Sequence, residues 1–335
     1  MSRPLPAPDE ARQTTVLVAP PVSLRLSVTD ACQLRCIYCR PEHDRRSTPT
    51  ALLGARELVA FAKLVDRHVG LGKVRITGGE PLLRRELVAI VQGLANAGSW
   101  DLALTTNGQR LDGLAGELRK AGLRRLNVSL DSLRADVFRS LSRGGDITST
   151  RAGIDAALQA GFPPPKLNMV VMRGKNDDEV ASLVDFALAR GCELRFIELM
   201  ATGLSSQQCE SWFVSSGEIR ERLTESYSFE PLPVEAGASS RRFRVRSRHG
   251  RTGVVGFIAP TTAPFCASCR RLRLTSDGHL VSCLGEATSI ALASRLRAVD
   301  ERRDAELVSL IRSALLRKRK DEPLRIRGLM AAVGG

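Results

Sequence analysis

Between residues 24 and about 200 the sequence alternates between short apolar runs and longer amphipathic stretches. In the longer stretches, such as residues 55–69 and 85–97, apolar residues recur at helical spacing and glycine follows the last turn. We expect six strands, at Leu24–Thr29, Lys73–Thr77, Leu102–Thr106, Arg125–Leu130, Leu167–Met172 and Leu194–Leu199. Strands that alternate with helices build a parallel sheet with the helices outside. The repeat therefore predicts an α/β fold, either a doubly wound sheet or a curved partial barrel.

Polar and glycine-rich segments follow four of these strands. They are Thr29-Asp30, Thr77–Pro81, Thr105–Gly108 and Ser129–Asp131. In parallel sheets of both kinds, active sites lie at the carboxyl ends of the strands, so we expect these segments to meet at one site. The first of them leads directly into the cysteines at 32, 36 and 39, which places that group at the mouth of the sheet.

Six of the eight cysteines fall in two tight groups. The groups are Cys32, Cys36 and Cys39, and Cys266, Cys269 and Cys283. Residues 1–21 are proline-rich and polar, lack the apolar core of a secretory signal, and are expected to be a disordered lead-in. Clustered cysteines without such a signal indicate metal binding in a reducing cytoplasm rather than disulfides. Three thiolates suit a [4Fe–4S] cluster that keeps one iron open, whereas zinc would need a fourth ligand such as His43 or His279.

Two motifs together resemble the signatures of the radical S-adenosylmethionine (SAM) superfamily. They are Cys-x3-Cys-x2-Cys with Tyr38 before its last cysteine, and Gly78–Pro81 after the second strand. The resemblance implies that Cys32, Cys36 and Cys39 hold the catalytic cluster, whose open iron chelates the methionine part of SAM. An electron from this cluster would split SAM into methionine and a 5′-deoxyadenosyl radical. The implied SAM contacts are Tyr38, Gly79, Ser129 and Met200.

Longer stretches narrow the resemblance to the GTP 3′,8-cyclase family, which acts first in molybdenum cofactor synthesis. These stretches are Leu24–Asp30, Arg75–Pro81, Leu104–Gly108, Asn127–Asp131, Arg195–Met200, Cys266–Cys283 and the final Gly334-Gly335. The implied fold is an incomplete (β/α)6 TIM-like barrel, the radical SAM core, over residues 22–204. A smaller α+β domain, residues 205–335, would close the mouth of the barrel, with Ser205–Gln208 at the boundary.

The same resemblance implies the substrate contacts. Cys266, Cys269 and Cys283 would hold a second [4Fe–4S] cluster whose vacant iron binds guanine, and the Gly334-Gly335 tail would enter the active site. The implied GTP contacts are Arg25, Arg75, Thr106, Lys166, Arg271, Leu272 and Arg273. Independently of any family, arginine beside a metal centre suits phosphate or purine recognition, because its planar fork donates bidentate hydrogen bonds.

The implied reaction begins when the deoxyadenosyl radical removes hydrogen from C3′ of GTP. The C3′ radical then attacks C8, and the product is 3′,8-cyclo-7,8-dihydro-GTP. The resemblance implies an external electron donor of the flavodoxin or ferredoxin type and a downstream partner, cyclic pyranopterin monophosphate synthase. The chain would work in the cytoplasm as a monomer or a homodimer.

Composition leaves two other classes of function open. The net charge of +14 favours anionic partners, but the 4% aromatic content leaves little material for stacking bases, so we expect no nucleic-acid partner. No apolar run is long enough to span a membrane. The alternatives are a radical SAM enzyme that modifies a peptide or RNA, and a non-catalytic zinc protein that binds RNA.

Three segments depart from the family pattern: Pro163–Pro165, Gly285-Glu286 and residues 328–333.

Overall fold

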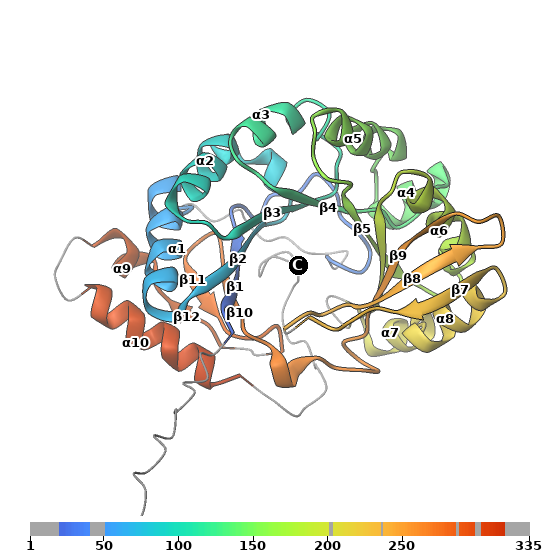
Figure 1. The fold of residues 1–335 in the computed structure, drawn as a ribbon. Coiled ribbons are helices and arrows are strands. Elements are labelled where there is room, and N and C mark those ends of the chain that lie inside the picture. The colour runs from blue at the N-terminus through green and yellow to red at the C-terminus, as the bar shows by residue number, and fades with distance from the viewer. Residues whose placement is uncertain are drawn as a thin grey trace, which may run out of the picture.

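The structure is a computed structural model that describes residues 20–40, 51–200, 204–235, 237–285, 288–298 and 303–318. Its core is the expected series of parallel strands. They are β1 (Val22–Ser27), β2 (Leu71–Thr77), β3 (Asp101–Thr106), β4 (Arg125–Ser129), β5 (Lys166–Val171) and β6 (Glu193–Glu198). Each pairs in parallel with the next strand in the sequence, which confirms the α/β fold predicted from the repeat. Figure 1 shows the sheet curving around a central space with helices on its outside.

The helices between these strands cover the outer face of the sheet. They are α1 (Ala55–Val69), α2 (Leu87–Ala97), α3 (Ala115–Lys120), α4 (Ala135–Ser142), α5 (Ile147–Gln159) and α6 (Val180–Ala189). The hydrophobic core lies between the two layers, where Leu24 and Leu26 of β1 and Phe61 of α1 are fully buried. After α1, Gly70 takes φ 81°, a left-handed conformation that glycine adopts without strain and that turns the chain into β2.

The strands that follow residue 204 extend the same sheet at both edges. The elements there are α7 (Ser206–Trp212), α8 (Ser216–Thr224), β7 (Tyr227–Pro231), β8 (Arg241–Ser247), β9 (Thr252–Ile258), β10 (Arg271–Leu274), β11 (His279–Val281), β12 (Ile290–Ala291), α9 (Ala293–Arg297) and α10 (Arg303–Leu316). β9 pairs with β6, and β10 pairs with β1, both in parallel. The strand order is β12-β11-β10-β1-β2-β3-β4-β5-β6-β9-β8-β7.

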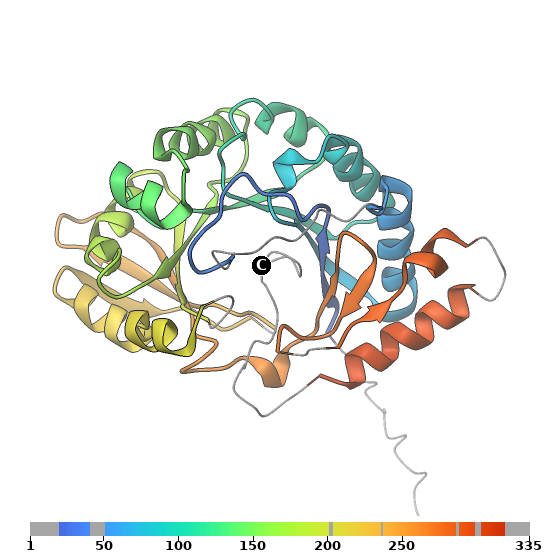
Figure 2. The same ribbon diagram turned by 180° about the vertical axis from the view of Figure 1, so that it is seen from behind.

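Figures 1 and 2 show these two groups of added strands on either side of the core strands, with α9 and α10 against α1. Residues distant in sequence therefore flank one inner face. The domain division at residue 204 stays a prediction, and the Gly334-Gly335 tail and His43 lie outside the described residues. Within the described ranges, no helix has the length and hydropathy needed to cross a membrane.

Candidate active site

A cavity of about 240 Å³ lies on the inner face of the sheet, where strand ends, the first cysteine loop and the segment 258–273 meet. It brings together most of the site residues predicted from the sequence: Arg25, Cys32, Cys36, Tyr38, Cys39, Arg75, Gly79, Thr106, Ser129, Met200, Arg271 and Arg273. The other predicted residues are not among its lining: Lys166, Leu272, Cys266, Cys269 and Cys283. Two of these have structural roles, because Lys166 forms an ion pair with Glu193 at 2.8 Å and Leu272 is fully buried in the core.

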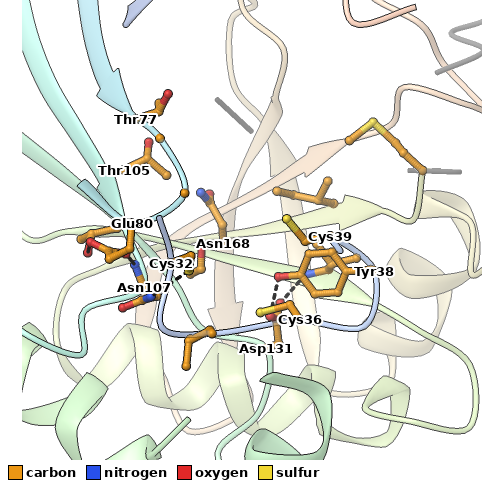
Figure 3. Close-up of a pocket in the computed structure, with 18 of the residues that line it drawn as sticks. Cys32, Cys36, Tyr38, Cys39, Thr77, Glu80, Thr105, Asn107, Asp131 and Asn168 are labelled. Atoms are coloured by element: carbon orange, nitrogen blue, oxygen red, sulfur yellow. Dashed lines mark hydrogen bonds between the residues drawn. The ribbon is translucent and has the colours of Figure 1, made fainter. Parts of the chain in front are cut away.

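The first cysteine loop is tied to α4 through its backbone. The amides of Arg35 and Ile37 donate to the carbonyls of Ser142 and Leu141 at 3.0 and 2.9 Å. Figure 3 shows Cys32, Cys36 and Cys39 on this loop at the cavity. Burial, and then the negative charge of nearby groups, raises the pKa of the Cys36 thiol well above its usual value. Three thiolates this close repel one another, so an iron cluster, which supplies positive metal charge, fits this loop.

The glycine turn after β2 packs directly against the start of that loop. A Cβ on Gly79 would lie 2.4 Å from the carbonyl oxygen of Ala31, so only glycine fits there. The amide of Gly79 donates to the carbonyl of Thr29 at 2.6 Å, and the amide of Glu80 donates to that of Ala31 at 2.7 Å. The two sequence motifs are thus hydrogen-bonded to each other, which fixes the turn beside the three thiols.

The carboxylate of Glu80 is buried within the fold. It accepts hydrogen bonds from the Thr106 hydroxyl at 2.7 Å, the Asn107 amide at 2.8 Å and the Leu82 amide at 3.0 Å. Burial outweighs these bonds and raises the pKa of Glu80 to about 7. The hydroxyl of Thr106, which the sequence analysis assigned to GTP, is therefore engaged by Glu80.

Three uncharged polar side-chain atoms of the cavity lining lack hydrogen-bond partners among the described residues. They are the hydroxyls of Thr77 and Thr105 and the amide oxygen of Asn168, all buried and carried by β2, β3 and β5 (Figure 3). A buried polar group without a partner costs about 1–3 kcal/mol. Their position indicates a ligand that supplies donors and acceptors at these points. Thr105 was predicted only as part of the polar segment Thr105–Gly108 and was given no ligand, although strand alternation places it on the face opposite Thr106.

Tyr38 and Asp131 join the cysteine loop to the sheet. The Tyr38 hydroxyl donates to Asp131 at 2.7 Å, and the amide of Val170 donates to the other carboxylate oxygen at 2.9 Å (Figure 3). Burial raises the pKa of Asp131 to about 6, and burial followed by Asp131 raises the pKa of Tyr38 well above its usual value. Sequence analysis gave Asp131 no role of its own, although it ends one of the polar segments.

A row of arginines forms the electropositive side of the cavity. Arg25 of β1 is paired in register with Arg75 of β2 and with Arg273 of β10, and paired residues project from the same face of a sheet. Burial, followed by repulsion from neighbouring arginines, lowers the pKa of Arg75 to about 9 and that of Arg273 to about 10. Arg195 of β6 also lines the cavity and was not predicted, although strand alternation could have found it.

Buried cations require anionic partners, and the Nε atom of Arg75 is buried with no partner among the described residues. Two carboxylates lie at the edge of the row, where Asp101 forms an ion pair with Arg125 and Glu193 forms one with Arg195. They leave the centre of the row positive. Such a row can bind a polyanion such as a triphosphate.

The second cysteine group lies beside β10. Cys269 precedes β10 and Cys283 follows β11, and the antiparallel pairing of these strands brings the two cysteines to one end of the hairpin. The amide of Gly285 donates to the Cys283 sulfur at 3.4 Å. Burial and the neighbouring thiols raise the pKa of Cys266. Burial acts in the same direction on Cys269, but Lys318 and Arg271 outweigh it and lower the pKa of that thiol.

Within the described ranges, no three His, Cys, Asp or Glu side chains converge closely enough to hold a single metal ion. A tetrahedral zinc site would need four such ligands at about 2.0–2.3 Å from the metal. A cubane cluster separates its thiolates more widely than one ion does, because each cysteine binds a different iron. Both cysteine groups suit a cluster by ligand number, and each has an amide donor to sulfur: the Asn107 side chain to Cys32 at 3.9 Å and the Gly285 backbone to Cys283 at 3.4 Å.

Comparison with known proteins identifies the family. Residues 26–187 match the Radical SAM superfamily, and residues 192–323 match the family described as Molybdenum Cofactor Synthesis C. The protein of Ectopseudomonas mendocina named GTP 3′,8-cyclase is 44% identical over 279 residues, which cover 82% of each chain. This chain belongs to the GTP 3′,8-cyclase family. A second GTP 3′,8-cyclase, from Geobacter sulfurreducens, is 46% identical over 264 residues, which cover 78% of this chain and 79% of its own.

The likeness to solved structures concerns the fold alone. Streptococcus suis SuiB, solved bound to S-adenosylmethionine, superimposes with a TM-score of 0.62 at 14% identity, over 92% of this chain and 67% of its own. Membership of the GTP 3′,8-cyclase family confirms the radical SAM class, and with it SAM and iron–sulfur clusters as the cofactors. The roles of individual site residues stay predictions.

Proposed function

We propose that this chain converts GTP to (8S)-3′,8-cyclo-7,8-dihydroguanosine 5′-triphosphate in a radical SAM reaction, the first step of molybdenum cofactor synthesis. The observation that carries the proposal is one cavity lined by three elements: the first cysteine loop, the Gly79-Glu80 turn and the arginine row. Membership of the GTP 3′,8-cyclase family supports it.

In the proposed mechanism Cys32, Cys36 and Cys39 hold the first cluster. When bound there, the cluster and SAM would supply the radical chemistry needed to remove hydrogen from C3′ of GTP. The chain's own residues position these partners. The loop and the Gly79-Glu80 turn are locked by their mutual hydrogen bonds, and the unpartnered Thr77, Thr105 and Asn168 atoms offer hydrogen bonds to a ligand's polar groups.

The arginine row holds the triphosphate in this proposal. Arg25, Arg75 and Arg273 are fixed by strand pairing before the substrate arrives, so little reorganisation accompanies binding. Cys266, Cys269 and Cys283 would hold the second cluster, which would supply a binding point for the guanine. Orientation of C8 toward C3′ from both ends contributes a large share of the rate by proximity.

Three further parts of the proposal concern the setting of the reaction. A flavodoxin- or ferredoxin-type donor supplies electrons, and cyclic pyranopterin monophosphate synthase consumes the product. The reducing cytoplasm suits cysteines that bind clusters, and none of the eight cysteines forms a disulfide in the structure.

An anaerobic assay tests the proposal. The chain, reconstituted with iron and sulfide to about eight iron atoms for two clusters, is incubated with GTP, SAM and dithionite. We expect 5′-deoxyadenosine and a cyclised nucleotide in equal amounts. Unchanged GTP, together with modification of a peptide or an RNA, would redirect the assignment to the alternative radical SAM class.

A further inference from the structure

Lys318 lies against the second cysteine group, although 35 residues separate it from Cys283 in the sequence. Its ammonium nitrogen is 3.4 Å from the Cys269 sulfur and 3.1 Å from the carbonyl oxygen of Ser282. Ser282 directly precedes Cys283. A single side chain therefore bridges the two chain segments that carry the thiolates of this group.

Helical spacing explains why Lys318 reaches this place. In α10 the residues Leu307, Ile311 and Ala314 form the buried face that packs toward α1 and β11. Lys318 follows Ala314 by one turn, and the bond from the Arg317 amide to the Ser313 carbonyl continues the helical turn beyond the end of α10. Lys318 thus continues the buried face, whereas the adjacent Arg317 is exposed.

Among the described residues, no carboxylate forms an ion pair with Lys318. Its partners in these ranges are a thiol sulfur and a backbone carbonyl. A largely buried ammonium is stable only beside an anionic or strongly polar partner. The sulfur that accepts from Lys318 belongs to Cys269, one of the three cysteines proposed to bind the second cluster.

From this geometry we infer that Lys318 is a positioning residue for the second cluster, which it stabilises by donating to the Cys269 thiolate and to the Ser282 carbonyl. The inference rests on the proposal that Cys266, Cys269 and Cys283 hold that cluster. Hydrogen bonds and positive charge at a cluster's sulfur atoms favour its reduced, more negative state and so raise its reduction potential. Partners of this kind also contribute to metal retention. Lys318 would thereby link the last helix of the described chain to the cluster.

The test compares Lys318→Met with Lys318→Arg and with the exposed neighbour, Arg317→Met. Each substitution is made in the full chain and in a chain whose Cys32, Cys36 and Cys39 are all alanine, which can load only the second cluster. The measurements are the potential of that cluster by electron paramagnetic resonance titration and the rate at which a chelator removes its iron. We expect Lys318→Met to lower the potential and to lose iron on the order of ten-fold faster.

Lys318→Arg keeps the charge, so its cluster potential and its rate of iron loss should lie closer to those of the unsubstituted chain. Arg317→Met should have the same potential and rate as the unsubstituted chain. If Lys318→Met behaves like Arg317→Met in both measurements, the inference is overturned. A separate result would contradict the assignment of the second cluster to Cys266, Cys269 and Cys283. In that case a chain with alanine at all three positions would keep its full iron content. Circular dichroism of each variant separates loss of the cluster from loss of the fold.

Discussion

The two cysteine groups have the same number of ligands but different charged neighbours. Around the first group burial dominates, and Asp131 adds negative charge, so the pKa of Cys36 is raised well above its usual value. Around the second group, Lys318 and Arg271 are close enough to lower the pKa of Cys269 despite burial. The second group thus has positive charge beside one of its thiols, Cys269, although burial and the neighbouring thiols still raise the pKa of Cys266.

This difference suits a division of labour between two clusters. Negative surroundings lower a cluster's reduction potential, so its reduced form is a stronger reductant, as the cleavage of SAM requires. Positive surroundings attract an anionic nucleotide and stabilise the charge of the cluster beside it.

Cysteine substitutions give the largest expected effects. Cys36→Ala should abolish both 5′-deoxyadenosine formation and cyclisation, because no cluster remains to supply the electron. Cys283→Ala should abolish cyclisation but leave slow cleavage of SAM, since the first group is intact. Product analysis under anaerobic conditions measures both activities. Cyclisation at an undiminished rate in Cys283→Ala would remove the distinction between the two groups.

Loss of one arginine from the row should mainly lower the activity of the chain toward GTP. Arg75→Met removes a charge-assisted hydrogen bond worth about 1.5–3 kcal/mol, so kcat/KM for GTP should fall by roughly 10- to 100-fold. Slow SAM cleavage without GTP should not change. The exposed Arg124→Met is the matched control. An equal loss in both variants would assign the effect to net charge rather than to the row.

The pH dependence of the free energy of unfolding tests the buried carboxylate of Glu80, which lies in the turn beside the first cysteine group. Burial raises the pKa of Glu80 to about 7, above its value in the unfolded chain, so the folded chain binds this proton more tightly. The resulting stabilisation is complete below about pH 4.5 and is lost as the pH rises toward 7, by on the order of 3 kcal/mol. Denaturant unfolding of the metal-free chain measures this slope. Glu80→Gln should flatten it and the exposed Glu117→Gln should not; a wild-type slope in Glu80→Gln contradicts the assignment.

The smallest expected effects come from substitutions of two adjacent threonines, one of which should change ligand affinity and the other stability. Thr105→Val removes a hydroxyl that lines the cavity without a partner among the described residues, so ligand affinity should fall several-fold while stability is kept. Thr106→Val removes a donor to Glu80, which should lower the free energy of unfolding by about 1–3 kcal/mol. Isothermal titration with SAM and with GTP, alongside denaturant unfolding, distinguishes them. The reverse pattern would support the original assignment of Thr106 to the substrate.

The sequence by itself determined the six core strands that alternate with helices, the two cysteine groups and the glycine turn. These are local features. Residues close in sequence decide the helical and strand periodicity, the spacing of ligands and the residues of a turn. All six predicted core strands are present, with ends that differ by a few residues. Family membership followed from the same motifs, since each of them needs particular residue types at a fixed spacing.

Only the tertiary structure decided which side chains share the site. Register across β10, β1 and β2 set Arg273, Arg25 and Arg75 in one row and turned Leu272 into the core. The contact of Lys318 with Cys269 depends on how α10 packs against segments far away in sequence. The reason is physical: alternation specifies two faces of a strand, but only packing decides which face is inside.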